Sequence, residues 1–217
     1  MRLVLVGPPG SGKGTQAEML RDRYGLTLIG TGNILRDAIN RGAHPELKAI
    51  LAQGRLAPDD TVNQLVRELF CGEQSPKDYV LDGYPRTLAQ AIWFDGLLKE
   101  LSTKLDGVIQ YAVSDEDVVR RISGRLSCPV CKAVYHLTTK PPKMAGICDR
   151  EGANLVLRDD DREEVIRERL RVFHDTQDDL VAYYKNNGLL HVIPALGTPE
   201  AIYTQTNNYL QSLRKAG

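Results

Sequence analysis

The sequence predicts an α/β protein built on a doubly wound parallel sheet of five strands, with helices on both faces and one inserted lobe. Short apolar runs alternate along the chain with longer segments of helical periodicity, and the first apolar run ends in a glycine-rich turn. Helical periodicity is lost over residues 127–157, where three cysteines and three prolines occur together. Because alternating strands and helices form a parallel sheet covered on both sides, we interpret the irregular stretch as an insertion.

The expected strands are short apolar runs bounded by glycine, proline or polar residues, as in strands buried within a parallel sheet. They cover residues 2–6, 26–29, 79–82, 108–113 and 189–193. The expected helices have apolar residues at three- and four-residue spacing and end near glycine, proline or the next apolar run. They cover residues 13–24, 33–40, 46–53, 60–70, 88–101, 115–126, 160–185 and 198–213.

Composition narrows the class of protein. The chain has 217 residues, of which 42% are hydrophobic, and this length fits one core domain with an insertion. Its 28 basic residues balance its 28 acidic residues and only 6% are aromatic, so a general nucleic-acid binder is not expected. No apolar run approaches the roughly 18 residues that cross a bilayer. The first run is too short for a signal peptide, so we expect a cytoplasmic protein that does not contact membranes.

A glycine-rich loop between the first strand and the first helix indicates a phosphate site. Residues 7–15 read Gly-Pro-Pro-Gly-Ser-Gly-Lys-Gly-Thr. Glycines let successive backbone N–H groups curl around phosphate oxygens, and the helix N-terminus adds partial positive charge. Lys13 is placed to reach the β- and γ-phosphates, as in P-loop NTPases. The expected contacts to a nucleoside triphosphate are Gly10, Ser11, Gly12, Lys13, Gly14 and Thr15.

The loop departs from the usual pattern at one position. Ser or Thr normally follows the lysine directly and binds Mg²⁺, but here Gly14 occupies that place and Thr15 comes next. We therefore expect Mg²⁺ to keep more of its water shell. Asp82, at the end of the third expected strand, is the candidate to hold that shell. The chain has no Asn-Lys-x-Asp sequence, which argues against a guanine-binding GTPase.

Four motifs, in order along the chain, resemble those of adenylate kinases of the long, lid-bearing bacterial type. They are the loop at 7–15, Thr-Gly-Asn-Ile-Leu-Arg at 31–36, Asp-Gly-Tyr-Pro-Arg-Thr at 82–87 with Gln90, and Arg-Ile-Ser-Gly-Arg at 121–125. The resemblance covers essentially the whole chain, and Asp-Gly-Tyr-Pro-Arg is highly specific for nucleoside monophosphate kinases. It implies reversible in-line phosphoryl transfer in a closed, arginine-lined cleft, Mg·ATP + AMP = 2 ADP, by a monomer.

The resemblance also divides the chain into three parts. A core domain would comprise residues 1–29, 58–126 and 158–217, and residues 30–57 would bind the nucleoside monophosphate. Residues 127–157 would form a lid that closes over the phosphates and excludes water.

Phosphoryl transfer between two polyanions needs several cations more than it needs a covalent side chain. Arginine suits this purpose because its planar fork binds phosphate oxygens in pairs. In the expected helix 115–126, Arg121 and Arg125 lie one turn apart and would face the same way. The residues expected to act in catalysis are Lys13, Arg86, Arg121, Arg125, Arg158 and Arg169.

The resemblance assigns the remaining nucleotide contacts. On the ATP side it implies Arg125, Val134 and Tyr135. On the AMP side it implies Thr31, Arg36, Ala57, Gly83, Arg86, Gln90, Arg158 and Arg169. Gly30 and Asn33 depart from the family, which usually has Ser and Asp at these positions. Asn33 lacks the negative charge that would organise the water around the metal.

The cysteine-bearing stretch resembles the metal-binding lid of many bacterial adenylate kinases. Two residues separate Cys128 from Cys131, and sixteen separate Cys131 from Cys148. A structural zinc ion needs four ligands in a tetrahedron, and Glu151 stands where the fourth is expected. That position is commonly Cys or Asp in the family, and the alternative to a zinc knuckle is a lid with three free thiols. Cys71, which follows Leu69 and Phe70, is expected in the core.

Three alternative functions share some of these sequence features. The first is a different nucleoside monophosphate kinase, which would bind another base in the acceptor, as with UMP or CMP, or in the donor, as with GTP. The full-length lid argues against the short UMP/CMP type, and Thr31 and Gln90 favour AMP. A zinc-ribbon nucleic-acid module fused to an NTPase core conflicts with the neutral charge. A non-catalytic nucleotide sensor conflicts with the presence of Lys13, Asp82 and all the candidate arginines.

Overall fold

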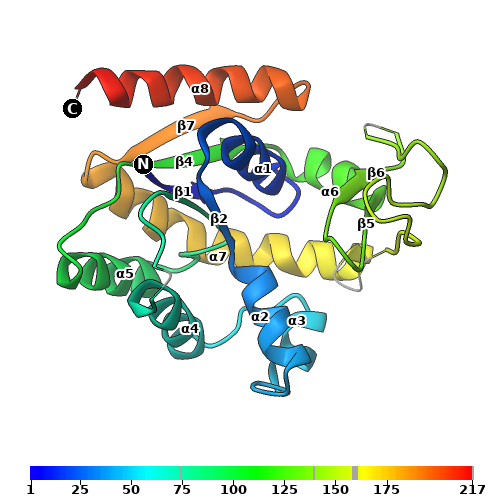
Figure 1. Ribbon diagram of the computed structural model, residues 1–217, viewed down its shortest axis with the longest axis horizontal. Coiled ribbons are helices and arrows are strands. Elements are labelled where there is room, and N and C mark those ends of the chain that lie inside the picture. Colours follow the sequence, from blue (N-terminus) through cyan, green and yellow to red (C-terminus); the bar gives the residue numbers. More distant parts are fainter. Residues whose placement is uncertain (74, 139, 158–160, 217) are drawn as a thin grey trace.

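The computed structural model describes residues 1–73, 75–138, 140–157 and 161–216. Its main sheet has five parallel strands in the order β2-β3-β1-β4-β7 (Figure 1). These strands are β1 (Arg2–Val6), β2 (Thr27–Gly30), β3 (Tyr79–Asp82), β4 (Gly107–Ala112) and β7 (Leu190–Pro194). The expected five-stranded parallel sheet is therefore confirmed.

Helices follow the strands as the alternating pattern predicts. They are α1 (Lys13–Tyr24), α2 (Thr31–Asn40), α3 (Leu47–Ala52), α4 (Asp59–Cys71), α5 (Leu88–Glu100), α6 (Asp115–Ser123), α7 (Glu163–Asn186) and α8 (Pro199–Ala216). Among the described residues, no helix is both long and apolar enough to cross a membrane.

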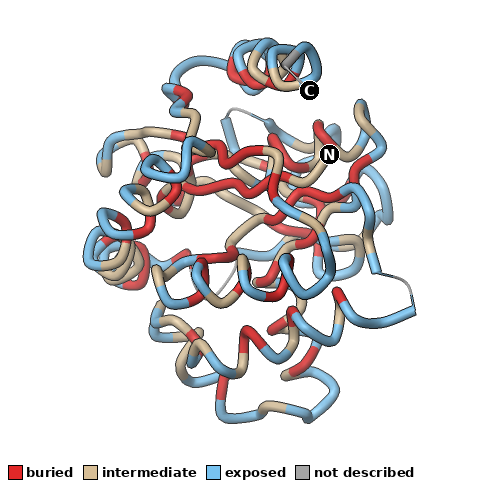
Figure 2. Tube along the Cα trace, turned by 90° about the vertical axis from the view of Figure 1, so that its left-hand side faces the viewer, coloured by how far each residue is buried: buried red, intermediate tan, exposed pale blue. Residues whose placement is uncertain are grey.

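The sheet is buried on both faces, as the continuous apolar character of its strands requires. Successive strand residues point to opposite faces, so Leu3 and Leu5 of β1 join one core cluster, with α1 and α8. Val4 and Val6 join the other, with α4, α5 and α7. Figure 1 shows α8 and α1 on one side of the sheet and α7, α5 and α4 on the other. In Figure 2 the buried positions concentrate along the strands and on the inward sides of the helices.

The register of the sheet places the two best-marked motifs together. β1 pairs with β3 in parallel, and Leu5 lies opposite Asp82. The loop that follows β1 and the Asp-Gly turn that follows β3 therefore leave the sheet at the same edge. Ligands bind at this carboxyl edge in open α/β sheets.

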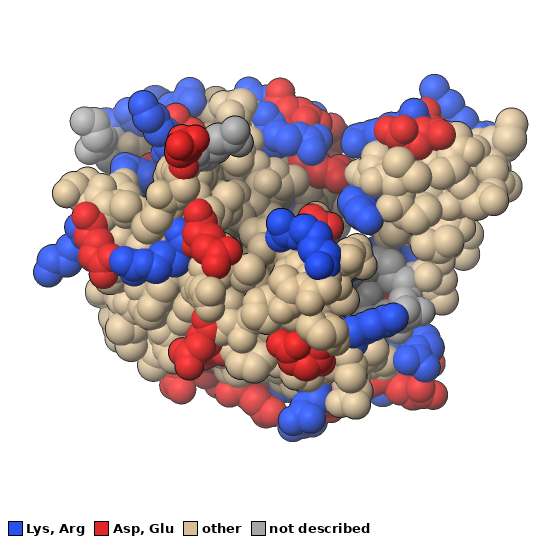
Figure 3. Space-filling model, turned by 60° about the horizontal axis from the view of Figure 1, so that its bottom comes forward, with Lys and Arg blue, Asp and Glu red and all other residues tan. Residues whose placement is uncertain are grey.

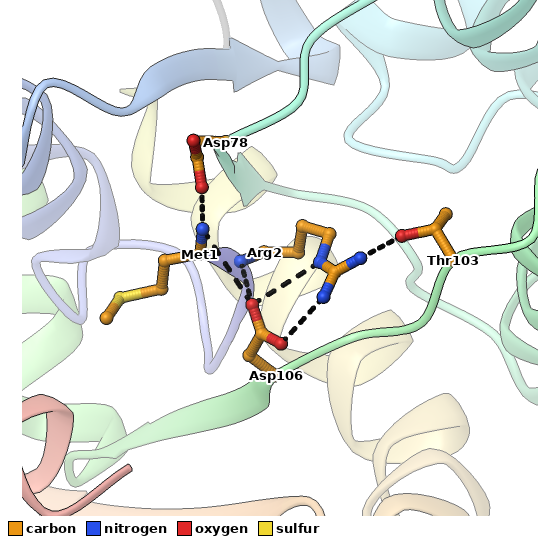
Figure 4. A network of polar contacts seen from close by, with 5 residues as sticks. All are labelled: Met1, Arg2, Asp78, Thr103 and Asp106. Atoms are coloured by element: carbon orange, nitrogen blue, oxygen red, sulfur yellow. Dashed lines mark hydrogen bonds and ion pairs between the residues drawn. The ribbon is translucent and has the colours of Figure 1, made fainter. Parts of the chain in front are cut away.

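A polar network ties together the opposite, amino-terminal edge of the sheet (Figure 4). The Asp106 carboxylate accepts hydrogen bonds from the Arg2 backbone N–H at 2.7 Å and from the Arg2 guanidinium at 3.0 Å. The same guanidinium also donates to Thr103, and the Met1 amino group pairs with Asp78. A hollow of about 1090 Å³ lies beside this network, at the edge of the sheet opposite to the phosphate loop.

The inserted lobe contains a small sheet that the sequence pattern does not predict. Its strands β5 (Arg125–Ser127) and β6 (Val134–His136) pair antiparallel, with Leu126 opposite Tyr135. The expected helix 115–126 therefore ends three residues early, at Ser123. Gly124, just after the helix, lets the His136 ring of β6 approach closely, because a Cβ there would lie 2.7 Å from that ring.

Two expectations from the sequence are wrong: the shared helix face of Arg121 and Arg125, and the burial of Cys71. Because α6 ends at Ser123, Arg125 belongs to a strand and does not share a helix face with Arg121. Cys71, expected in the core, is exposed at the last position of α4, because the buried face of that helix ends at Phe70.

Candidate active site

The phosphate loop connects β1 to α1 at the carboxyl edge of the sheet. Lys13 folds back over it, and its Nζ donates to the Gly7 carbonyl at 2.6 Å, to the Pro8 carbonyl at 2.7 Å and to Ser11 Oγ at 3.3 Å. Gly12 precedes α1 with φ of 94°, a left-handed conformation that favours glycine. The Lys13 ammonium therefore lies over the loop at the start of a helix, where anions bind.

Two loop glycines are required by close packing. A Cβ on Gly10, whose φ is +74°, would lie 2.7 Å from the side chain of Ile122 in α6. A Cβ on Gly7 would lie 2.7 Å from the backbone carbonyl of Tyr111 in β4. The loop therefore lies tightly against its neighbours, and this packing fixes its shape before any ligand binds.

Asp82 lies beside the loop, as expected from the pairing of β1 with β3. A Cβ on Gly14 would lie 3.4 Å from Asp82 Oδ2. Burial lowers the pKa of Lys13 to about 8, and the Asp82 charge opposes this shift. This edge of the sheet thus carries a carboxylate and an ammonium close together, which fits a site for a metal-bound polyphosphate.

The Asp-Gly turn after β3 gathers residues of the expected monophosphate side. The Gly83 carbonyl accepts hydrogen bonds from Thr31 Oγ1 at 2.7 Å and from Arg86 Nε at 2.8 Å. Gly83 has φ of +85°, and a Cβ there would lie 2.9 Å from Arg86 Nη2, so this position in the turn favours glycine. Arg36 Nη2 donates to Asn33 Oδ1 at 2.8 Å within α2.

A buried hydrogen-bond network surrounds Gln90, which is 2% exposed. Gln90 Nε2 donates to Asp59 Oδ1 at 2.7 Å, and Gln90 Oε1 accepts from the Arg86 backbone N–H at 2.8 Å. Thr87 Oγ1 donates to Asp59 Oδ2 at 2.8 Å. Sequence reasoning missed Asp59, because an acid in the first turn of a helix is ordinary and carries no further signal. Ala57, two residues earlier, is buried.

Three of the expected arginines approach the same edge from different elements. Arg121 of α6 donates to the Ala195 carbonyl at 2.6 Å and to the Ser11 carbonyl at 3.5 Å. Arg125 of β5 forms a two-point ion pair with Asp161, whose side chain is fully buried. Arg169 of α7 lies 3.8 Å from the same carboxylate. Asp161 thus links two arginines. Arg158 lies outside the described residues.

The three lobe cysteines converge. The Sγ atoms of Cys128, Cys131 and Cys148 all lie within 4.8 Å of one another, and the Cys131–Cys148 distance is 3.6 Å. The carboxylate of Glu151 is not part of this group. Burial opposes ionisation of Cys148, but hydrogen bonds from Tyr135 and from the backbone N–H groups of residues 150 and 151 lower its pKa to about 6. Soft thiolates at this spacing fit a zinc ion.

The Tyr135 hydroxyl is occupied inside the lobe. It lies 3.5 Å from Cys148 Sγ and accepts from the Asp149 backbone N–H at 2.9 Å. Tyr135 is buried, whereas Val134 is half-buried. Any contact of Tyr135 with ATP therefore falls to its backbone.

The fold and the site together define a P-loop phosphotransferase. A family model described as adenylate kinase matches residues 5–189. An adenylate kinase of Anaeromyxobacter sp. strain Fw109-5 is 44% identical over 214 residues, which are 98% of this chain and 100% of that protein. One of Archaeoglobus fulgidus is 41% identical over 216 residues, 99% and 100% of the two chains. One of Acholeplasma laidlawii is 45% identical over 192 residues, 87% and 88% of the two chains.

The chain therefore belongs to the adenylate kinase family. It is a nucleoside monophosphate kinase, a phosphotransferase that catalyses Mg·ATP + AMP = 2 ADP.

Proposed function

We propose that ATP binds with its phosphates on the loop over residues 10–15 and that AMP binds against the Asp-Gly turn after β3. The observation that supports this most strongly is the pairing of β1 with β3, since it brings Lys13 and the Gly83–Arg86 turn to one edge of the sheet. On the AMP side, Arg36 and Arg86 hold the phosphate, while Thr31, the backbone at Ala57 and Gln90 contact the adenine. On the ATP side, Arg125 and the backbone of residues 134–135 complete the site.

Catalysis in this site is positioning and charge neutralisation. Lys13, Arg86, Arg121, Arg125, Arg158 and Arg169 surround the transferred group and offset the charge that develops on its oxygens. Those that the structure describes come from the loop, the β3 turn, α6, β5 and α7, so the cations surround the phosphates only when the parts of the chain assemble around both nucleotides. No side chain needs to act as a general base.

Asp82 fits a role in Mg²⁺ binding, because its Oδ2 lies beside Gly14 in the phosphate loop. The residue after Lys13 is a glycine and offers no hydroxyl, so the carboxylate would act through metal-bound water. The cation would neutralise charge on the β- and γ-phosphates.

The lobe is proposed to be a lid. We assign residues 127–157 to this lid and residues 1–29, 58–126 and 158–217 to the core. Figure 3 supports the division, because an indentation separates a protruding lobe from the rest of the surface. Residues 30–57 form the third part, which binds the monophosphate. Closing the lobe would exclude water, so that the phosphoryl group passes to AMP and not to solvent.

The assay that tests this function offers a panel of acceptors and donors. ³¹P NMR of enzyme, Mg²⁺, ATP and AMP is expected to show both ADP resonances growing. AMP is expected to exceed UMP, CMP and GMP as acceptor, while a preference for GTP as donor would favour the alternative kinase. A spectrum that never changes would refute the assignment.

Because the phosphate loop, acceptor residues and arginines all come from one chain, we also propose a monomer acting in the cytoplasm, where these nucleotides occur.

Nucleotide binding is expected to be linked to proton uptake. The pKa of Lys13 is about 8 in the free enzyme, so part of the population is neutral at pH 8 to 9. Bound phosphates favour the ammonium and raise that pKa, so ATP binding takes up roughly half a proton near pH 8, and ATP affinity falls as pH rises further. Calorimetry in two buffers of different ionisation enthalpy measures the uptake. Equal heats in both buffers, or an uptake that survives in Lys13→Met, would contradict the prediction.

The cysteine group is proposed to hold one structural zinc ion, with Glu151 as the candidate fourth ligand. Elemental analysis of purified protein is expected to give about one zinc per chain, falling below about 0.2 in Cys148→Ser. Cys71→Ser is the matched control, since that thiol is exposed and far along the chain from the group. Wild-type protein with less than about 0.2 metal per chain would refute the site. A full complement in Glu151→Ala would remove that residue from the ligand set.

A further inference from the structure

We propose that Asp59 is a specificity-determining positioning residue, which fixes the orientation of the Gln90 carboxamide and so makes the acceptor site select 6-amino purines over 6-oxo purines. This inference rests on the proposed function, in which Gln90 contacts the base of the acceptor. Asp59 itself is not proposed to touch the nucleotide.

Asp59, Thr87 and Gln90 form a closed ring of hydrogen bonds between α4 and the start of α5. Asp59 begins α4, and Gln90 lies in the first turn of α5. One carboxylate oxygen accepts from Gln90 Nε2 at 2.7 Å, and the other accepts from Thr87 Oγ1 at 2.8 Å. Thr87 caps α5 and accepts from the Gln90 backbone N–H at 3.1 Å. Asp59 therefore anchors both the side chain of Gln90 and the helix start that carries it.

The neighbours of Gln90 permit only one orientation of its amide. A carboxylate can only accept, so it must face Nε2, and the Arg86 backbone N–H can only donate, so it must face Oε1. A flipped amide would set two acceptors against each other at Asp59 and two donors against each other at Arg86. Because Gln90 is buried, water cannot relieve these contacts.

A fixed amide distinguishes the two kinds of purine. After the contacts to Asp59 and Arg86, the carboxamide of Gln90 has one N–H and one oxygen lone pair left. Adenine presents a donor at its 6-amino group and an acceptor at N1, whereas hypoxanthine and guanine present an acceptor at O6 and a donor at N1. The 6-oxo purines thus require the opposite order of donor and acceptor. A locked Gln90 fits one order, and an unlocked Gln90 can turn to fit either.

The test compares AMP with IMP as acceptor at saturating ATP. Asp59→Ala is expected to lower the ratio of kcat/KM for AMP to that for IMP by about tenfold or more, mostly through KM for the acceptor, with KM for ATP unchanged. Asp59→Asn, which has nearly the same shape and keeps one acceptor, is expected to fall between Asp59→Ala and the wild type. Asp60→Ala is the matched control, because it removes an exposed carboxylate from the same first turn of α4 and leaves the Gln90 contacts in place.

A second background separates positioning from general damage. In Gln90→Leu, adding Asp59→Ala is expected to change the AMP/IMP ratio no further, because Asp59 acts through the amide that is already gone. The proposal is overturned if neither Asp59 variant lowers the ratio by at least threefold, or if Asp59→Ala lowers it equally in the Gln90→Leu background. Wild-type protein that forms no ADP from ATP and AMP would instead refute the proposed function.

Discussion

Lys13→Met is expected to lower kcat for ADP formation by about 10²- to 10³-fold, the range for removing one preorganised group from a transition-state charge site. The Lys13 ammonium lies over the loop and donates to the Gly7 and Pro8 carbonyls. It is therefore positioned, before any ligand binds, to contact phosphates bound on the loop. Methionine keeps much of the side-chain length and removes the charge. The loss should appear in kcat as well as in KM for ATP, because charge on the transferred group grows in the transition state.

The control for this prediction is Lys99→Met, which removes an exposed ammonium from α5. Steady-state kinetics at saturating AMP, with a melting curve for each variant, make the comparison. Loop packing depends on Gly7 and Gly10 against Tyr111 and Ile122, so the fold of Lys13→Met should persist. A kcat within threefold of wild type would show that Lys13 does not stabilise the transferred phosphoryl group.

Arg169→Met is expected to lower kcat by about 10²-fold, because it removes one cation from the ring proposed around the transferred group. Arg169 lies near the buried Asp161 carboxylate that also holds Arg125. The stem of Arg169 packs on Gly54, where a Cβ would lie 2.9 Å from its Cγ, and methionine preserves most of that apolar contact. The effect should therefore come from lost charge and not from lost packing.

Arg167→Met supplies the comparison for Arg169. It lies two residues away on α7, is 68% exposed and pairs with Glu163. An exposed pair of this kind contributes little to stability, so the variant should keep full activity. Rapid-quench measurement of the transfer step separates chemistry from product release. Equal rates for the two variants would remove Arg169 from the transfer machinery.

The main sheet could be predicted because its determinants are local. The apolar run of β1 and the glycines that follow it specify a strand and a phosphate loop without reference to the rest of the chain. The lobe could not be predicted in the same way, because the partner of β5 is β6, seven residues further on, and neither strand is long or apolar enough to show a pattern. The end of α6 was predicted three residues too late for the same reason, because residues 125–127 pair with β6.

The site shows the same division between local and long-range signals. Lys13, Asp82 and Arg86 belong to motifs whose residue types indicate phosphate or metal binding. The structure places all three at the carboxyl edge of the sheet. Asp59 and Asp161 stand in ordinary acidic contexts, and only the folded chain reveals that each serves a neighbouring side chain. Sequence motifs identify groups that meet a substrate better than they identify the groups that hold them.

One helix, α7, contacts both the proposed monophosphate-binding part and the core of the sheet. α7 has 24 residues, so its length is about 36 Å. Its first half carries Arg169 and meets Gly54, while its second half is anchored in the core through Leu180 and Tyr184. We therefore expect α7 to set the spacing between the proposed donor and acceptor sites. One inserted residue before Leu180 would rotate everything upstream by about 100° and shift it by about 1.5 Å along the helix axis. The length of this segment should therefore tolerate far less variation than the length of the lobe.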